Sequence, residues 1–171
     1  MKIICAWCSK VMKEYESHQD MVSHGICPEC LRGLIGSTDI NLRDILDKLD
    51  FPVLLTDGAV MVQRANRKAE MAFGTPLTNM LTNVTLGVAI ECLDAQGTGQ
   101  CGRTEHCAGC MLRGTILSTH ADGQPRYGVY AQNRFLTSFG AKTKRFRFST
   151  TRVGDAVMLA IEEILDLSAA S

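Results

Sequence analysis

Apolar residues recur along the chain with two different periods, and the change between them predicts where helices give way to strands. Four of them follow the helical spacing i, i+3, i+4 and i+7: Leu42, Ile45, Leu46 and Leu49. This stripe predicts a helix over residues 39–50 that packs either on its own domain or on a second copy of the chain. Beyond Phe51 the apolar runs become short and strand-like. An Asp-Gly turn joins the first two runs, residues 53–57 and 60–66, into an expected antiparallel pair.

Helical and strand-like segments then alternate along the rest of the chain. A short helix is predicted between Asn66, which suits an N-cap, and Gly74, which suits a C-terminal stop. Two more helical segments are expected at residues 88–93 and 111–120. The last three strands are expected at residues 127–135, 142–152 and 156–162. This order predicts an α+β fold with a five-stranded antiparallel sheet and helices on one face.

Length and composition limit the class of protein. The 171 residues are enough for one domain of ordinary size and a small appendage. No apolar run is long enough to span a membrane or to serve as a signal peptide, so we expect a cytoplasmic protein. Its eight cysteines are then expected to be reduced. Lys+Arg and Asp+Glu both number 18, and this zero net charge predicts no strong attraction to nucleic acid.

The eight cysteines fall into two groups of four. The first group has the spacing C-x2-C-x18-C-x2-C: Cys5, Cys8, Cys27 and Cys30. Two such pairs match a zinc ribbon, in which each tight turn supplies two thiolates and the pairs complete a tetrahedron. His18 and His24 lie nearby but are not needed as ligands. We therefore expect residues 1–36 to form a zinc-binding segment that folds with its metal, and residues 37–171 to form a second domain after a linker at residues 33–39.

The second group is spaced C-x8-C-x5-C-x2-C: Cys92, Cys101, Cys107 and Cys110. Its spacing leaves four interpretations open. The group can bind a structural zinc ion or an iron-sulfur cluster, since both are held by four thiolates. Alternatively, Cys107 and Cys110 form a disulfide as a thiol switch. The last interpretation is that all four are buried, inert cysteines.

Positively charged residues flank this second group. Arg103, His106 and Arg113 would lower the pKa of nearby thiols by supplying positive charge. Solvent exposure on a loop is the alternative for all three. Arg113 begins the following helix and can instead reach the domain cavity.

Basic residues also crowd the predicted strand 142–152. Period-two alternation puts Phe146 and Phe148 in the core and leaves Arg145 and Arg147 outside. Because the net charge is zero, we expect a solvated face, or one paired with acidic residues of a neighbouring helix, rather than a phosphate site.

Three stretches resemble the PAS sensor domain family. Residues 51–58, FPVLLTDG, are similar to the opening hairpin of PAS domains, and residues 64–70, RANRKAE, to the Asn-capped helix after the second strand. Residues 157–164 resemble the strand that in PAS proteins leads into a signalling helix. The resemblance covers roughly residues 39–167. It implies signal reception, usually by a ligand or cofactor held between the sheet and the helices.

The second cysteine group lies in a segment similar to a subset of bacterial PAS proteins, which have a Cys-Gly-x4-Cys-x2-Cys loop followed by an arginine. The matching residues are Cys101, Gly102, Cys107, Cys110 and Arg113. The sequence SHGICPECL around the second N-terminal pair also resembles a four-cysteine segment found ahead of bacterial sensor domains.

Two PAS cofactor classes can be weighed from the residues. The flavin-binding photosensors need an Asn-Cys-Arg-Phe motif, but residues 133–135 are Asn-Arg-Phe without the cysteine. A haem would need an axial ligand on the helix before the third strand, where His120 lies. A solvated histidine at a helix C-terminus is the alternative. Arg113 and His120 are therefore the candidates for contact with a cavity cofactor, whose identity stays open.

These observations predict a non-enzymatic bacterial signal-sensing protein whose second cysteine group is a redox-responsive or metal-responsive element. We find no catalytic triad, phosphate loop or metalloprotease motif. Two alternatives are a transcription-associated or nucleic-acid-binding adaptor led by the zinc ribbon, and a thiol oxidoreductase using Cys107 and Cys110. We expect a homodimer through residues 39–50. The chain ends soon after the last strand, without the output domain that commonly follows PAS domains. We therefore expect either an isolated module that docks to a signalling partner or a fragment of a longer protein.

Overall fold

The computed structural model describes residues 1–16, 21–36, 42–74, 84–137 and 140–167, which build two sheets. The N-terminal subdomain, residues 1–16 and 21–36, contains the small sheet and one helix. Its elements are β1 (Lys2–Cys5), β2 (Val11–Glu14), β3 (Val22–Gly25) and α1 (Pro28–Gly36). Strand β1 lies in the centre, antiparallel to β2 and parallel to β3.

The main domain, described from residue 42 to residue 167, contains the large sheet. Its strands are β4 (Val53–Thr56), β5 (Val62–Ala65), β6 (Arg126–Thr137), β7 (Gly140–Val153) and β8 (Ala156–Leu167). Its helices are α2 (Leu42–Leu46), α3 (Arg67–Phe73), α4 (Leu86–Ala89), α5 (Leu93–Gln96), α6 (Glu105–Ala108) and α7 (Met111–Asp122). All neighbours in the order β5-β4-β8-β7-β6 are antiparallel. The predicted α+β fold with a five-stranded antiparallel sheet is confirmed.

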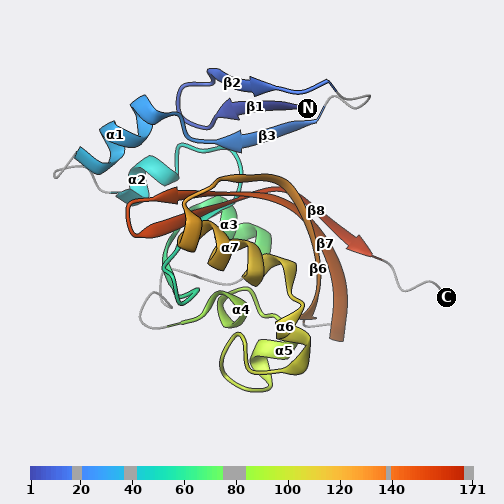
Figure 1. The fold of residues 1–171 in the computed structure, drawn as a ribbon. Coiled ribbons are helices and arrows are strands. Elements are labelled where there is room, and N and C mark those ends of the chain that lie inside the picture. The colour runs from blue at the N-terminus through green and yellow to red at the C-terminus, as the bar shows by residue number, and fades with distance from the viewer. Residues whose placement is uncertain (17–20, 37–41, 75–83, 138–139, 168–171) are drawn as a thin grey trace.

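Both faces of the large sheet are covered, as Figure 1 shows, with the N-terminal subdomain on one face and α3 to α7 on the other. The inner core lies under the helices and includes Phe146, Phe148 and Leu159. The outer core lies under the N-terminal subdomain and α2, and joins seven buried residues: Ile26, Leu46, Leu49, Val53, Leu55, Met158 and Ala160. Strand β4 is buried along its whole length for this reason. Helices cover one face, as predicted, and the N-terminal subdomain covers the face that the sequence left open.

The Asn66 side chain ties α2, β4 and α3 together. It is fully buried, and its Oδ1 accepts hydrogen bonds from the backbone N–H groups of Val53 (2.9 Å) and Ala69 (3.0 Å). Its Nδ2 donates to the carbonyls of Leu46 (3.1 Å) and Phe51 (2.9 Å). Asn66 is thus the predicted N-cap of α3, and it also donates to two carbonyls before the sheet begins.

Several elements differ from their predictions. The expected helix at residues 88–93 is two short helices, α4 and α5, because Glu91 adopts a left-handed backbone conformation with φ 58° that no helix continues through. Helix α6 was not predicted. The expected linker at residues 33–39 falls partly in α1, which runs to Gly36, and its remainder lies outside the described residues.

The stripe at residues 42–49 packs on its own chain. Helix α2 covers only five residues, and Leu46 and Leu49 are buried in the outer core. These two side chains are therefore unavailable to a second copy. Part of the expected dimer helix, residues 39–41, lies outside the described residues, and dimerisation stays a prediction. Across the described ranges, no helix combines the length and apolar character needed to cross a membrane.

Candidate metal and thiol sites

The first cysteine group converges on one point. Cys5 ends β1, Cys8 follows in the turn, Cys27 follows β3, and Cys30 lies in the first turn of α1. Their four sulfurs all lie within 4.8 Å of one another, and Cys8 Sγ is 3.8 Å from Cys27 Sγ. A tetrahedral zinc ion with Zn–S bonds of about 2.3 Å separates its sulfurs by about 3.8 Å. The geometry therefore fits one tetrahedral, thiolate-bound metal ion.

The second pair differs from the expected ribbon. A zinc ribbon places both pairs in tight turns, but here Pro28 opens helix α1 directly after Cys27. Proline suits the first helical position because its missing N–H would have no partner there. Backbone N–H groups point at the sulfurs: that of Cys27 donates to Cys5 Sγ at 3.4 Å, and that of Cys30 to Cys27 Sγ at 3.5 Å. One pair is thus held by a turn and the other by a helix N-terminus.

Ionisation of these thiols is uneven. Burial disfavours the Cys5 thiolate, but hydrogen bonds from the backbone N–H groups of Cys27, Cys8 and Trp7 lower the pKa of Cys5 to about 7. Burial and the neighbouring thiols raise the pKa of Cys30. The site can therefore hold one thiolate by itself, whereas four thiolates at these distances need a bound cation to offset their repulsion.

His24, one of the two neighbouring histidines, is not part of this cluster. His24 stacks on the ring of Phe51 with 4.3 Å between centroids, and its Nδ1 is buried without a hydrogen-bond partner. Burial lowers its pKa, Glu162 opposes this shift, and Arg147 adds to it. His24 is therefore neutral and belongs to the interface with the main domain. His18 lies outside the described residues.

The second cysteine group surrounds a small space without closing on it. Cys92 caps α5, Cys107 lies in α6, and Cys110 caps α7. Cys92, Cys101 and Cys110 line a cavity of about 20 Å³. Within the described parts of the chain, only the N-terminal group brings three or more ligand atoms within 4.8 Å of one another. As folded, the second group therefore lacks the compact geometry of a single zinc ion.

The pKa values of the internal thiols diverge. Burial raises the pKa of Cys92 and Cys101, and neighbouring cysteines raise that of Cys101 further. Burial also acts against ionisation of Cys107, but the Thr104 hydroxyl, whose Oγ1 is 3.2 Å from Cys107 Sγ, and two backbone N–H groups outweigh it and lower the pKa. Cys107 is thus the most readily ionised of these three.

The predicted flanking residues have separate positions. Arg103 is exposed and donates from Nε to Gln100 at 2.8 Å, and His106 is also exposed. Arg113 lines the small cavity and lies over Gly102, where a Cβ atom would come within 2.8 Å of Arg113 Nε. Glycine is required there because its φ is 95° and the guanidinium occupies the adjacent space.

The second cofactor candidate, His120, lies outside the lining of this cavity. It packs on Gly58, where a Cβ atom would be 2.5 Å from its ring, and its Nε2 is 3.2 Å from the carbonyl of Asp155. It therefore sits between the β4–β5 and β7–β8 turns. The cavity of about 20 Å³ holds about one water molecule, whereas small-molecule pockets measure roughly 300–1,000 Å³. As folded, this cavity has no room for a haem, and His120 does not face it.

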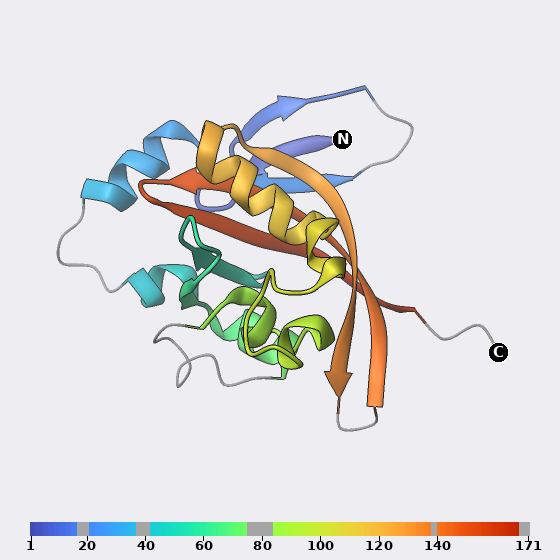
Figure 2. The same cartoon turned by 60° about the horizontal axis from the view of Figure 1, so that its bottom comes forward.

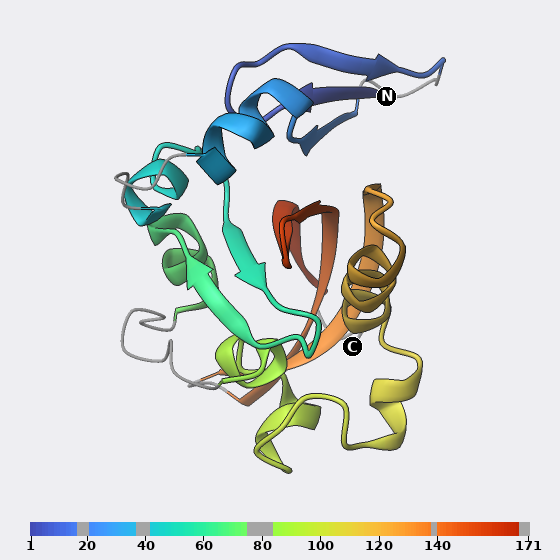
Figure 3. The ribbon, with the colours of Figure 1, turned by 60° about the vertical axis from the view of Figure 1, so that its left-hand side comes forward.

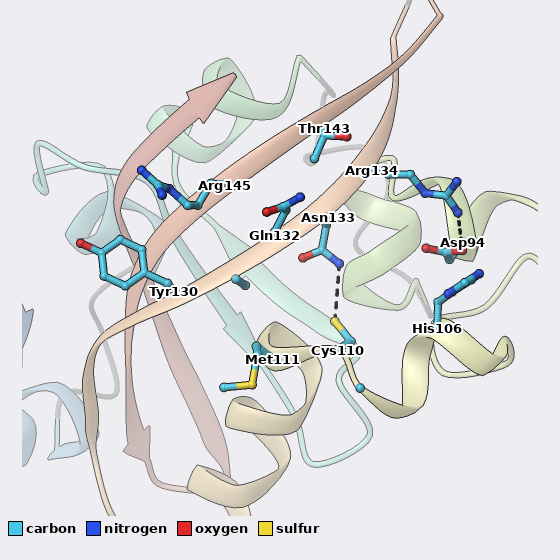
Figure 4. Close-up of a pocket in the computed structure, with 12 residues that line it drawn as sticks. Asp94, His106, Cys110, Met111, Tyr130, Gln132, Asn133, Arg134, Thr143 and Arg145 are labelled. Carbon is cyan, nitrogen blue, oxygen red and sulfur yellow. Dashed lines mark hydrogen bonds and ion pairs between the residues drawn. The ribbon is translucent and has the colours of Figure 1, made fainter. Parts of the chain in front are cut away.

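A larger groove lies beside the edge strand β6, where the sequence gave no signal. It has a volume of about 630 Å³, and Figure 4 shows side chains from β6, β7 and the cysteine-rich segment around it. Asn133 Nδ2 lies 3.5 Å from Cys110 Sγ, and Arg134 pairs with Asp94 at 3.3 Å. Figure 2 shows the long β6 and β7 strands passing this segment. The groove gives solvent access to Cys110 from the strand side.

The basic strand is used at the interface between the two subdomains. Phe146 and Phe148 are buried in the inner core and Arg145 is exposed, as predicted. Arg147 lies on the outer face, where its Nη1 pairs with Glu162 of β8 at 2.8 Å. The expectation of a solvated or helix-paired face is wrong for Arg147, because its acidic partner is on the adjacent strand and the N-terminal subdomain covers both.

Comparisons with known proteins found similarity in structure only. No family model and no curated protein matches the chain. One similar solved structure is a PAS domain of an HTR-like protein from Haloarcula marismortui, which is 13% identical with a TM-score of 0.45 over 74% of this chain and 94% of that one. Another is a domain of a sensory box sensor histidine kinase/response regulator from Geobacter sulfurreducens, which is 11% identical with a TM-score of 0.44 over 71% of this chain and 90% of that one. A third is the photoactive yellow protein domain of a sensor histidine kinase from Rhodospirillum centenum, which is 13% identical with a TM-score of 0.42 over 77% of this chain and 97% of that one.

Proposed function

We propose that this protein is a non-enzymatic, PAS-like signal-sensing protein whose N-terminal subdomain binds one zinc ion through Cys5, Cys8, Cys27 and Cys30. The observation that carries the proposal is the convergence of these four sulfurs within 4.8 Å. Zinc is favoured over harder cations because all four donors are thiolates, and the 3.8 Å sulfur separation suits a tetrahedral ion.

The zinc stoichiometry of the full chain tests this proposal. We expect wild-type protein, purified anaerobically, to bind at least one zinc ion per chain, and the Cys27→Ser variant to lose one equivalent. Cys101→Ser, which removes a thiol of the other group, is the matched control and should keep the N-terminal zinc. A wild-type protein that binds no stoichiometric metal, or an unchanged zinc content in Cys27→Ser, would refute the assignment.

A second candidate function is redox sensing by the internal cysteine group. Three of its sulfurs border one small cavity, yet the group is too widely spaced for one zinc ion. A polynuclear iron-sulfur cluster separates its four thiolates farther than a single ion does, so it is the metal centre that this wider spacing leaves open. Positive charge from Arg113 at the cavity wall would stabilise bound thiolates.

The metal content and colour of anaerobically purified protein distinguish the interpretations of this group. Brown protein with iron and sulfide supports the cluster. Colourless protein with two zinc ions per chain would refute it and make both groups structural. One zinc ion with oxidisable Cys107 and Cys110 thiols would favour the switch.

The proposal extends to partners. A PAS-like sensor acts by changing an interface when its site changes state, so we propose a signalling protein partner and a homodimer. If the dimer forms through residues 39–50, it uses side chains other than the buried Leu46 and Leu49. Light scattering on the full chain tests the dimer. If the chain stays monomeric at concentrations up to about 100 μM, its self-association is weaker than that of a typical physiological dimer, and the proposed dimer is refuted.

A further inference from the structure

The outer face of the large sheet contains a buried carboxylate, that of Glu162 on β8, whose side chain is 1% exposed. A buried charge is costly unless it is paired and hydrogen-bonded. Two partners belong to the main domain: Arg147 Nη1 at 2.8 Å and the Ser149 hydroxyl at 2.5 Å. The other two belong to the N-terminal subdomain: the Ser23 hydroxyl at 3.2 Å and the backbone N–H of His24 at 2.9 Å. Glu162 is therefore shared by the two subdomains.

The two donors from the N-terminal subdomain lie on β3, next to the cysteine site. This strand ends at Gly25, and Cys27 follows two residues later. Its close approach to the large sheet is visible at Gly25, where a Cβ atom would lie 2.8 Å from the Tyr127 ring. Arg147 also donates to the Val22 carbonyl at 3.0 Å. Figure 3 shows the N-terminal sheet and α1 on the opposite side of the large sheet from α4 to α6.

We propose that Glu162 is the residue that couples metal occupancy at the N-terminal site to the outer face of the large sheet. The bound metal fixes Cys5 of β1 to Cys27, and thereby holds β3 where Ser23 and His24 meet the carboxylate. When the metal leaves, β3 loses this restraint and Glu162 loses two of its four partners. This inference rests on the proposed zinc binding.

The consequence is an uncovering of the outer core. Val53, Leu55 and Met158 are buried there against Ile26 and other residues of the N-terminal subdomain, α2, the segment that follows it and Val153 of β7. Release of the subdomain exposes these apolar side chains together with Arg147 and Glu162. A change in metal or thiol state at one end of the chain thus becomes a change in the surface of β8, the last strand of the sheet.

Linkage makes this coupling measurable from both sides, because two coupled equilibria affect each other by the same factor. If the Glu162 contacts favour the metal-bound arrangement, then Glu162→Gln weakens zinc binding. Glutamine keeps the shape but loses the charge, and its NH2 group faces donors. A lost charge-assisted hydrogen bond corresponds to about a tenfold loss of affinity.

The first experiment measures the zinc affinity of the full chain in competition with a chelator. We expect about tenfold weaker binding in Glu162→Gln, still at wild-type stoichiometry. Asp166→Asn is the matched control, because Asp166 lies on the same strand, is 58% exposed and pairs with Lys144 at 3.8 Å. It should bind zinc as the wild type does.

The second experiment needs no variant, so it remains decisive if Glu162→Gln folds poorly. Carbodiimide labelling of carboxyl groups in wild-type protein is followed by mass spectrometry, with zinc bound and after its removal by chelation. We expect Glu162 to become labelled only after zinc removal, while Glu163, which is 43% exposed, is labelled in both states.

The outcomes separate the two proposals. If wild-type protein binds zinc but Glu162 stays unlabelled after its removal and Glu162→Gln keeps its affinity, the coupling is overturned and the zinc site stands. If wild-type protein binds no zinc, the proposed function itself fails and the coupling fails with it.

Discussion

The two cysteine groups of this chain each contain four thiols within a short stretch of sequence, but their thiols reach different arrangements in space. In the N-terminal group each C-x-x-C pair is held locally, one by a turn and the other at the N-terminus of α1, so only two units have to meet, and the small sheet brings them together. The internal group has one such pair and two single cysteines, distributed over α5, α6, α7 and the turn between them. Paired spacing therefore builds a site locally, whereas single cysteines depend on the packing of several elements.

Their surroundings differ as well. The first group lies in a subdomain with a small core, which is expected to depend on metal binding for its stability. The second lies against the inner core of the main domain, where the packing of the large sheet and the Asn66 hydrogen bonds contribute stability of their own. Loss of metal should therefore unfold one region and spare the other.

The largest expected effect comes from Cys5→Ser. It removes a buried metal ligand, and binding of structural zinc supplies about 10–16 kcal/mol in small zinc domains. We expect amide hydrogen exchange to show loss of protection in residues 1–36 while β4 to β8 stay protected. Cys92→Ser is the control from the other group and should leave residues 1–36 protected. Equal loss of protection in both variants would contradict the expectation that residues 1–36 depend on their own cysteine group alone.

The next largest effect is expected from Asn66→Ala, which removes four hydrogen bonds to backbone groups, three of them buried. We expect the free energy of unfolding of the main domain to fall by about 3 kcal/mol or more. Gln63→Ala, an exposed polar residue of β5, should change it by less than about 0.5 kcal/mol. Denaturant unfolding of zinc-loaded protein measures both. A small change in the free energy of unfolding for Asn66→Ala would mean that these hydrogen bonds contribute little to the stability of the main domain.

A moderate effect is expected from Gly87→Ala. The added Cβ would lie 2.8 Å from Ala95 Cβ and 3.1 Å from Cys101 Sγ, so the wall of the small cavity has to shift. We expect a loss of about 1–3 kcal/mol in the stability of the main domain, with zinc at the N-terminal site unchanged. Gly114→Ala is the matched control, because a Cβ atom added there would meet no described atom within 4 Å outside its own helix backbone and chain neighbours. Alanine also favours a helix over glycine. Equal melting temperatures for the two variants in thermal unfolding would contradict the close packing at Gly87.

The smallest effect concerns thiol reactivity inside the internal group. Burial raises the pKa of Cys92 and Cys101 above their usual 9.0, whereas Cys107 has a lowered pKa because hydrogen bonds from Thr104 outweigh its burial. In metal-free protein, alkylation of Cys107 should therefore rise at a lower pH than that of the other two. Thr104→Val should move the Cys107 profile to higher pH, as mass spectrometry of alkylated peptides would show. An unchanged profile would mean that the hydroxyl has no part in the shift.

Much of the main domain could be predicted because its signals are local. Asn66 caps α3 and Gly74 ends it with φ 71°, both as expected from residue type. Phe146 and Phe148 point into the core because strand side chains alternate. The break at Glu91 could not be predicted, since nothing in its residue type indicates a positive φ.

By itself, the sequence determined the five strands of the large sheet, the two cysteine groups and the convergence of the first, because each depends on neighbours a few residues apart. Only the tertiary structure decided that the N-terminal subdomain covers the second face of the sheet and that the internal cysteines stay apart. Glu162 illustrates the reason. A charged residue in a strand suggests a solvent-exposed position, and its burial follows from donors on β3, 138 and 139 residues away in sequence. Long-range contacts of this kind leave no periodic trace in the chain.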